Sequence, residues 1–213
     1  MSGHPDLRLI VITDRGLARP RDVMTVVQAA LDAGAPAIQL RDKLATAAEL
    51  LRQARALLPL TRAAGALLFI NDRLDVALAA GADGVHLGPD DLPVAAARRI
   101  APRGFLVGCS TDDPDAARRA EADGADYIGC GAVFGTRTKT EVGAERIGVR
   151  RLDEVAAAVD IPVIGIGGIT AGNVAEVAAT RAAGAAAVGE IMAASDPAAA
   201  VTALLTPWSR AAG

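Results

Sequence analysis

Short apolar runs alternate with longer, alanine-rich stretches along the whole chain. The runs consist mainly of Val, Ile, Leu and Ala, and such continuous apolar segments are typical of strands that are buried on both faces of a parallel sheet. We predict eight strands from them: Leu9–Thr13, Ala37–Arg41, Leu67–Asn71, Gly84–Leu87, Leu106–Ser110, Tyr127–Gly131, Val163–Gly167 and Ala185–Gly189.

The intervals between these runs have helical composition or periodicity, for example over residues 22–33, 46–63 and 114–122. A glycine separates the helical stretch from the next apolar run at five places, Gly34, Gly65, Gly81, Gly124 and Gly184. Glycine readily takes the left-handed conformation that ends a helix, so the pattern predicts repeated helix-to-strand connections. Eight strands alternating with helices favour a closed barrel over an open doubly wound sheet. We therefore predict a (β/α)8 TIM barrel.

Length, composition and net charge indicate the number of domains, the kind of core and the class of partner. The chain has 213 residues, enough for one barrel, and no linker or low-complexity segment divides it, so we expect a single domain over residues 1–213. Hydrophobic residues make up 52% of the chain and aromatic residues only 2%, so the core is aliphatic. The net charge of −3 does not suggest a nucleic-acid surface.

The sequence also indicates where the protein works. No apolar run is long enough for a membrane helix, and the N-terminus lacks the organisation of a signal peptide. Cys109 and Cys130 show no metal-binding spacing, and we expect both to be buried free thiols of a cytoplasmic protein. The alanine-rich helix faces could pack between subunits of a homo-oligomer, or equally against the barrel.

Polar residues gather where the predicted strands end. In β/α barrels these carboxyl ends converge on one mouth, which is where active sites lie. The second strand leads into Gln39, Arg41 and Lys43, which alternation places on the same side. An amide with two cations suits a ligand that has both a heteroaromatic ring and phosphate, although the same residues could form a solvated ion-paired surface.

Carboxylates follow the next two strands. Asp72 ends the third strand region, and Asp90 and Asp91 follow the fourth. Mg2+ commonly takes one or two carboxylates and completes its octahedron with water and phosphate oxygens. Helix capping is the alternative for Asp72 and for one of the other two. Together, at adjacent positions of the mouth, they predict a metal site.

Three later segments have the composition of phosphate-binding loops. Phe134–Lys139 offers two hydroxyl groups and a lysine, while Gly165–Ile169 and Val188–Gly189 offer glycine backbone ahead of helix starts. Loops seven and eight are a common phosphate site of this fold. Neither a Walker phosphate loop nor a complete GxGxxG motif is present.

The mouth offers no nucleophile with a base partner. His86 is the only histidine near it, and we interpret that residue as a hydrogen-bonded part of the barrel interior. No GxSxG motif occurs, so covalent catalysis is not indicated. Electrostatic catalysis by metal, cations and backbone donors is the chemistry that remains.

These motifs together resemble the thiamine phosphate synthase family over nearly the whole chain. They are, in order, QLRDK, FINDR, GVHLGPDDLP, the GCS ending at Ser110, DYIGCG, the TRTK beginning at Thr136, and IGGI. The stretch from Gly184 to Glu190 is about three residues shorter than is usual in that family. Family members join a pyrimidine pyrophosphate to a thiazole phosphate, giving thiamine phosphate and pyrophosphate.

The resemblance implies a role for each matching residue. Two Mg2+ ligands are implied, Asp72 and Asp91. The pyrimidine pyrophosphate would contact Gln39, Arg41, Lys43, Asn71, Ser110 and Lys139, of which Lys139, Ser110 and Arg41 would act in catalysis. The thiazole phosphate would contact Thr136, Thr138, Gly168, Val188 and Gly189.

Two other readings stay open from sequence. A related thiazole tautomerase shares the fold and the thiazole phosphate site, but it uses a histidine after the fifth strand, where this chain has Ser110-Thr111-Asp112-Asp113. A non-catalytic barrel that binds phosphorylated ligands is the second alternative. The retained Arg41, Lys43, Asp72 and Lys139 favour the synthase.

Overall fold

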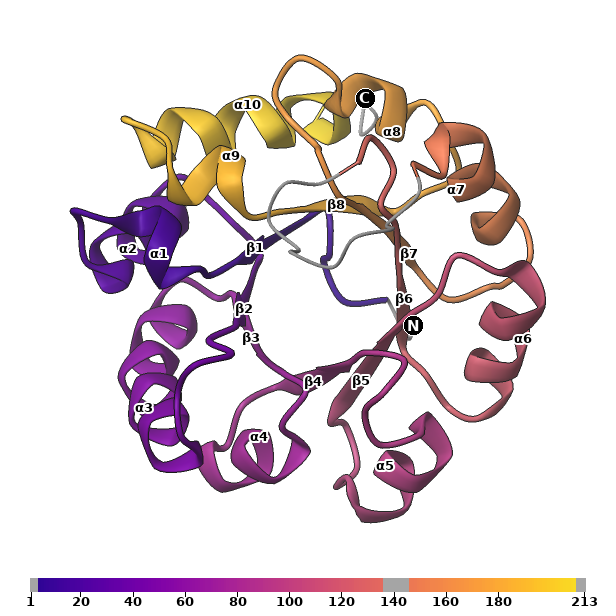
Figure 1. Ribbon diagram of the computed structural model, residues 1–213, viewed down its shortest axis with the longest axis horizontal. Coiled ribbons are helices and arrows are strands. Elements are labelled where there is room, and N and C mark those ends of the chain that lie inside the picture. Colours follow the sequence, from indigo (N-terminus) through magenta and orange to yellow (C-terminus); the bar gives the residue numbers. More distant parts are fainter. Residues whose placement is uncertain (1–3, 136–145, 210–213) are drawn as a thin grey trace.

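A computed structural model describes residues 4–135 and 146–209 of the chain. Eight parallel strands form a closed barrel in the order β1 to β8, with β8 paired to β1 (Figure 1). Each strand pairs with its sequence neighbours, and the alternating β/α order is that of a TIM barrel, as predicted. The strands are β1 Leu9–Ile12, β2 Ala37–Leu40, β3 Leu67–Asn71, β4 Gly84–Leu87, β5 Leu106–Ser110, β6 Tyr127–Cys130, β7 Val163–Ile166 and β8 Gly184–Ala187.

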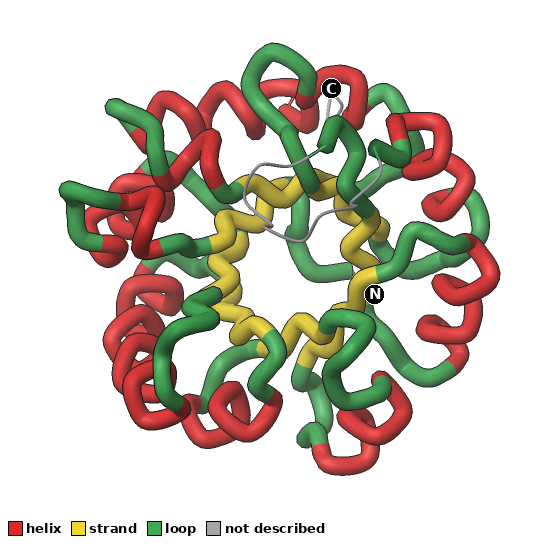
Figure 2. Tube along the Cα trace, viewed as in Figure 1, coloured by secondary structure: helices red, strands yellow, loops and turns green. Residues whose placement is uncertain are grey.

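Helices surround the barrel as an outer ring, which Figure 2 shows around the closed ring of strands. They are α1 Arg15–Ala18, α2 Val23–Asp32, α3 Ala47–Ala63, α4 Leu74–Ala80, α5 Val94–Ile100, α6 Pro114–Ala122, α7 Gly148–Ala156, α8 Val174–Ala178, α9 Gly189–Met192 and α10 Pro197–Ser209. None of the helices within residues 4–135 and 146–209 is long and apolar enough to cross a membrane.

Local sequence explains several of the helix boundaries. Thr46 and Glu49 form a reciprocal capping box that starts α3 where it was predicted to start. Four of the five glycines expected at helix-to-strand connections have positive φ; they are Gly34, Gly65, Gly81 and Gly124. The fifth prediction was wrong, because Gly184 lies inside β8, where an added Cβ would meet the Leu7 carbonyl oxygen at 2.0 Å.

Several strands are shorter at the carboxyl end than the apolar pattern suggested. Thr13, Arg41, Gly131 and Gly167 each lie one residue beyond the strand end, at the rim of the mouth. The largest difference is at β8, which ends at Ala187. Val188 looks like a strand residue in sequence, but it is the N-cap of α9. The short β8 still closes the barrel through its pairs with β1 and β7.

The barrel interior is filled by a few large side chains. Phe69 and Tyr127 are buried there and meet edge to face, with ring centroids 5.3 Å apart. Each ring occupies space left by a glycine: an added Cβ would come within 2.7 Å of the Phe69 ring at Gly84, and within 2.1 Å of the Tyr127 ring at Gly108. Both rings belong to an interior cluster of mainly aliphatic side chains, in which the Tyr127 hydroxyl is a polar group.

Candidate functional site

The ends of β2 and β3 bring two amide side chains together. Gln39, only 3% exposed, donates from Nε2 to Oδ1 of Asn71 over 2.8 Å. The bond joins two residues that the family resemblance assigned to the same ligand. Lys43 lies on the exposed loop that follows the same strand.

The backbone of Arg41 is held in place by the residue that follows β1. The Arg41 backbone N–H donates to Thr13 Oγ1 over 2.9 Å, and that hydroxyl donates to the Arg41 carbonyl over 3.1 Å. The guanidinium lies 3.7 Å from the carboxylate of Asp14. Sequence reasoning missed Thr13 and Asp14 as partners of Arg41, although both follow an apolar run, as the other mouth residues do.

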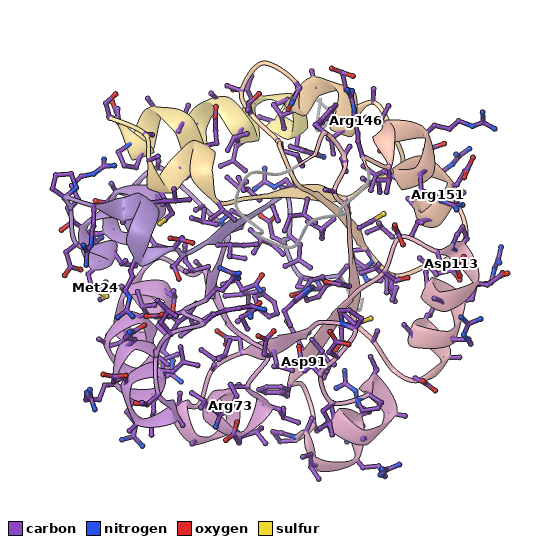
Figure 3. All side chains as sticks on the ribbon, viewed as in Figure 1. Met24, Arg73, Asp91, Asp113, Arg146 and Arg151 are labelled. Carbon is purple, nitrogen blue, oxygen red and sulfur yellow. The ribbon has the colours of Figure 1, made fainter. Side chains whose placement is uncertain are left out.

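The carboxylates after β3 and β4 occupy the same part of the mouth. Asp72 is a non-glycine residue with positive φ, 64°, and its backbone N–H donates to the His86 carbonyl over 2.8 Å. Asp91 accepts the backbone N–H of Gly88 over 2.7 Å, and Figure 3 places Asp91 on the inner side of the helix ring. The capping alternative is therefore wrong, since α4 and α5 start without a side-chain cap.

Burial and the neighbouring Asp91 affect the ionisation of Asp72. Burial, followed by a hydrogen bond with Asp91 and the like charge of Asp91, raises the pKa of Asp72 to about 6, against the opposing charges of Lys43 and Arg41. Two carboxyl groups that affect each other's ionisation in this way lie close enough to act on one cation. The described residues contain no group of three or more His, Cys, Asp or Glu side chains suited to a metal. A pair fits Mg2+, which completes its shell with water and substrate phosphate.

Ser110 ends β5 within a hydrogen-bonded chain. His86 Nε2 lies 2.9 Å from Ser110 Oγ, and His86 Nδ1 lies 3.0 Å from the Tyr127 hydroxyl oxygen. His86 thus has the hydrogen-bonded interior position expected from sequence. The link to Tyr127 could not have been read from the sequence, because it joins residues 41 positions apart.

The loop after β7 has the backbone shape of an anion site. Gly167 and Gly168 both have positive φ, 97° and 67°. The Asn173 side chain fixes this loop, since it accepts the Thr170 backbone N–H over 2.8 Å and donates to the Gly168 carbonyl over 2.9 Å. The exposed Gly168 backbone is thereby held open to the mouth.

The start of α9 lies beside this loop. Val188 is the N-cap and Gly189 the first helical residue. Glu190 accepts the backbone N–H of Ala171 over 2.9 Å, which ties the loop after β7 to the loop after β8. The three positions predicted to hold one phosphate therefore belong to two connected segments. Thr136, Thr138 and Lys139 lie outside the described residues.

Comparison with known proteins decides the family. The model of the thiamine monophosphate synthase family matches residues 9–191. The chain belongs to this family. It is 49% identical over 194 residues to a thiamine-phosphate synthase of Roseiflexus castenholzii, covering 91% of this chain and 85% of that protein. The corresponding enzyme of Moorella thermoacetica is 44% identical over 208 residues, with 98% of each chain covered.

The fold agrees with a solved member of the thiamine monophosphate synthase family. A thiamine phosphate pyrophosphorylase from Pyrococcus furiosus superposes with a TM-score of 0.89 at 41% identity, and 98% of each chain is covered. Membership of the family makes this chain a thiamine-phosphate synthase, a transferase of thiamine biosynthesis.

Proposed function

We propose that the mouth holds the two substrates side by side, with Mg2+ on the pyrophosphate. The observation that carries the proposal is the Asp72–Asp91 carboxyl pair beside the charges of Lys43 and Arg41. One place in the mouth thus combines metal ligands with cations, which is what a departing pyrophosphate requires.

The pyrimidine pyrophosphate lies across β2 to β5 in this proposal. Gln39 and Asn71 bind the pyrimidine ring, while Arg41, Lys43, Ser110 and Lys139 contact the pyrophosphate. The thiazole phosphate lies against Gly168, Val188 and Gly189, with Thr136 and Thr138. The Asn173 bonds that fix the loop after β7 support that assignment.

The reaction is a substitution at the methylene carbon of the pyrimidine. The carbon–oxygen bond breaks first, pyrophosphate leaves with the electron pair, and the ring nitrogen of the thiazole donates the pair that forms the new carbon–nitrogen bond. Mg2+ neutralises negative charge on the leaving pyrophosphate when it is bound. Arg41, Lys43 and Lys139 add fixed positive charge, and the two sites hold the partners in line.

The test is synthesis from purified components. The protein is incubated with both substrates and Mg2+, and thiamine phosphate and pyrophosphate are measured. Omission of either substrate should abolish product. A tautomerase would release no pyrophosphate, and a non-catalytic barrel would bind ligand without consuming it, so either result contradicts the proposal.

Two variants test the roles of residues. Asp72→Ala and Lys139→Ala should each lower turnover roughly 10²–10³-fold, as expected when one preorganised charge at the reacting centre is lost. Circular dichroism should show an intact barrel in both. Near-normal turnover in the two variants would contradict the assigned roles.

We further propose that the enzyme works in a reducing cytoplasm. Both cysteines are free and buried, and burial raises the pKa of Cys109 to about 11 and of Cys130 to about 12, which keeps the thiols protonated and unreactive. Assembly into a homo-oligomer stays a prediction, which sedimentation velocity would test.

A further inference from the structure

Three neighbouring strands contribute one hydrogen-bonded chain to the barrel interior. Tyr127 on β6, His86 on β4 and Ser110 on β5 are joined through the two ring nitrogens of His86, at 3.0 and 2.9 Å. Only Ser110 stands at a strand end that faces the mouth. The donor-to-acceptor direction of these two hydrogen bonds therefore decides whether Ser110 donates to a ligand or accepts from it.

The positions of both rings are fixed by packing. Tyr127 is 1% exposed, and its ring fills the space beside Gly108. The His86 ring fills the space beside Gly129, where an added Cβ would lie 2.9 Å from Cε1 of the imidazole. The two rings lie 5.5 Å apart between centroids. With the heavy atoms in these positions, only the proton positions along the two hydrogen bonds are left to determine.

Burial of the Tyr127 phenol decides which partner donates in its hydrogen bond with His86. Burial raises the pKa of Tyr127, so its hydroxyl keeps its hydrogen. Among the described residues, His86 Nδ1 is the one hydrogen-bond partner of that hydroxyl. If the phenol only accepted, its hydrogen would be buried without an acceptor, and unpaired buried donors are rarer and more costly than underused oxygen lone pairs. The phenol therefore donates to Nδ1.

We infer that Tyr127 holds His86 as the Nε2–H tautomer, and that Ser110 consequently accepts from His86 and directs its own hydroxyl hydrogen into the mouth. A serine in this state donates to ligands. It suits an anionic acceptor such as a phosphate oxygen, and it disfavours an amino group at the same place. Tyr127 and His86 are positioning residues that act through Ser110. The ligand's identity here rests on the proposed function, whereas the tautomer does not.

Nitrogen NMR tests the tautomer directly. The chain has only two histidines, and His4 lies exposed near the N-terminus, where it serves as an internal reference. At about pH 8, where an ordinary imidazole is neutral, we expect the ¹⁵N spectrum to show His86 protonated at Nε2, with Nδ1 as a hydrogen-bonded acceptor. In Tyr127→Phe the Nδ1 resonance should move to the chemical shift of an unprotonated imidazole nitrogen that has lost the hydrogen bond from the phenol. Protonation of His86 at Nδ1 in the wild type, or an unmoved Nδ1 resonance in the variant, would overturn the inference.

Kinetics test whether the chain acts through Ser110. Tyr127→Phe should lower kcat/KM for the pyrimidine pyrophosphate roughly three- to tenfold, the size of one oriented hydrogen bond. In a Ser110→Ala background the same substitution should change kcat/KM no further, since the two residues form one unit. Equal losses in both backgrounds would contradict the positioning role.

A matched control separates this effect from a general loss of a buried hydroxyl. Thr61→Val removes a buried hydroxyl whose one hydrogen-bond partner in the described part of the chain is the Leu58 carbonyl within α3, and kcat/KM should be unchanged. A wild-type protein that makes no thiamine phosphate would overturn the proposed function while the NMR result on His86 stayed readable.

Discussion

Thr13 offers a sharp test of how the fold positions Arg41. Its hydroxyl both donates to the Arg41 carbonyl and accepts the Arg41 backbone N–H, and the residue is 1% exposed. Thr13→Val keeps the shape of the side chain and removes both hydrogen bonds. The backbone N–H and carbonyl of Arg41 then lose their partner at the edge of the barrel.

The expected cost follows from those two groups. A buried polar group without a partner costs about 1–3 kcal/mol, so Thr13→Val should lower the free energy of unfolding by about 2–4 kcal/mol. For a barrel of this size the melting temperature should fall by roughly 5–12 °C. Thr13→Ser keeps the oxygen and should recover most of the loss.

Thermal and urea unfolding of Thr13→Val and Thr61→Val make the comparison. Both residues are buried threonines, but the Thr61 hydroxyl donates to the Leu58 carbonyl of its own helix and has no other partner within residues 4–135 and 146–209, so its loss should cost about 1 kcal/mol or less. KM for the pyrimidine pyrophosphate should rise in Thr13→Val alone. Equal destabilisation of the two variants, or an unchanged KM in Thr13→Val, would refute the argument that this clamp holds Arg41.

Three further predictions concern the metal pair, the barrel interior and the phosphate loop. Asp72→Asn should abolish the dependence of turnover on Mg2+ at neutral pH. The same substitution should stabilise the metal-free barrel by about 1 kcal/mol, a value reduced for partial exposure, because the raised pKa of Asp72 means that its ionised form destabilises the folded state. In the wild type, the ionised Asp72 destabilises the folded state above about pH 6, and this destabilisation disappears as the pH falls towards the ordinary aspartate pKa of 3.8. The free energy of unfolding of the metal-free protein should therefore rise as the pH is lowered over this interval, and a flat pH profile in urea titrations would contradict the prediction. Gly108→Ala should destabilise by about 3 kcal/mol or more, measured by melting, since its Cβ would overlap the Tyr127 ring. Gly172→Ala should cost about 1 kcal/mol or less, because its Cβ would lie 3.7 Å from Thr170 Oγ1, an ordinary contact distance. Asn173→Ala should raise KM for the thiazole phosphate roughly tenfold and leave KM for the pyrimidine pyrophosphate unchanged, as steady-state kinetics with each substrate varied would check.

The barrel was predictable because its signals are local. Apolar runs identified all eight strands, and glycine marked four helix ends correctly. The prediction failed where one residue type serves two local structures. Val188 continues an apolar run yet caps a helix, and Gly184 follows an alanine-rich stretch yet pairs within a strand. Only the pairing of β8 with β1 and β7 distinguishes these cases, and that pairing is non-local.

The candidate site was predictable in its residue types but not in its internal contacts. Strand-end positions were enough to gather Gln39, Asn71 and the two aspartates at one mouth. The left-handed backbone of Asp72 could not be foreseen, because aspartate rarely adopts it and the nearby sequence resembles an ordinary helix start. The Thr13–Arg41 contact joins residues 28 positions apart, so it depends on strand register.

The two aromatic rings in the barrel interior also bear on how this sequence can change over generations. Phe69 and Gly84 share one space, and Tyr127 and Gly108 share another, so a mutation at one member of a pair meets a clash or leaves a cavity until its partner changes too. Each pair should therefore be inherited as a unit, with compensating double replacements more frequent than single ones. Evolution of a new residue at either of these ring–glycine pairs would therefore require an unstable single variant as an intermediate, or simultaneous mutation of two codons.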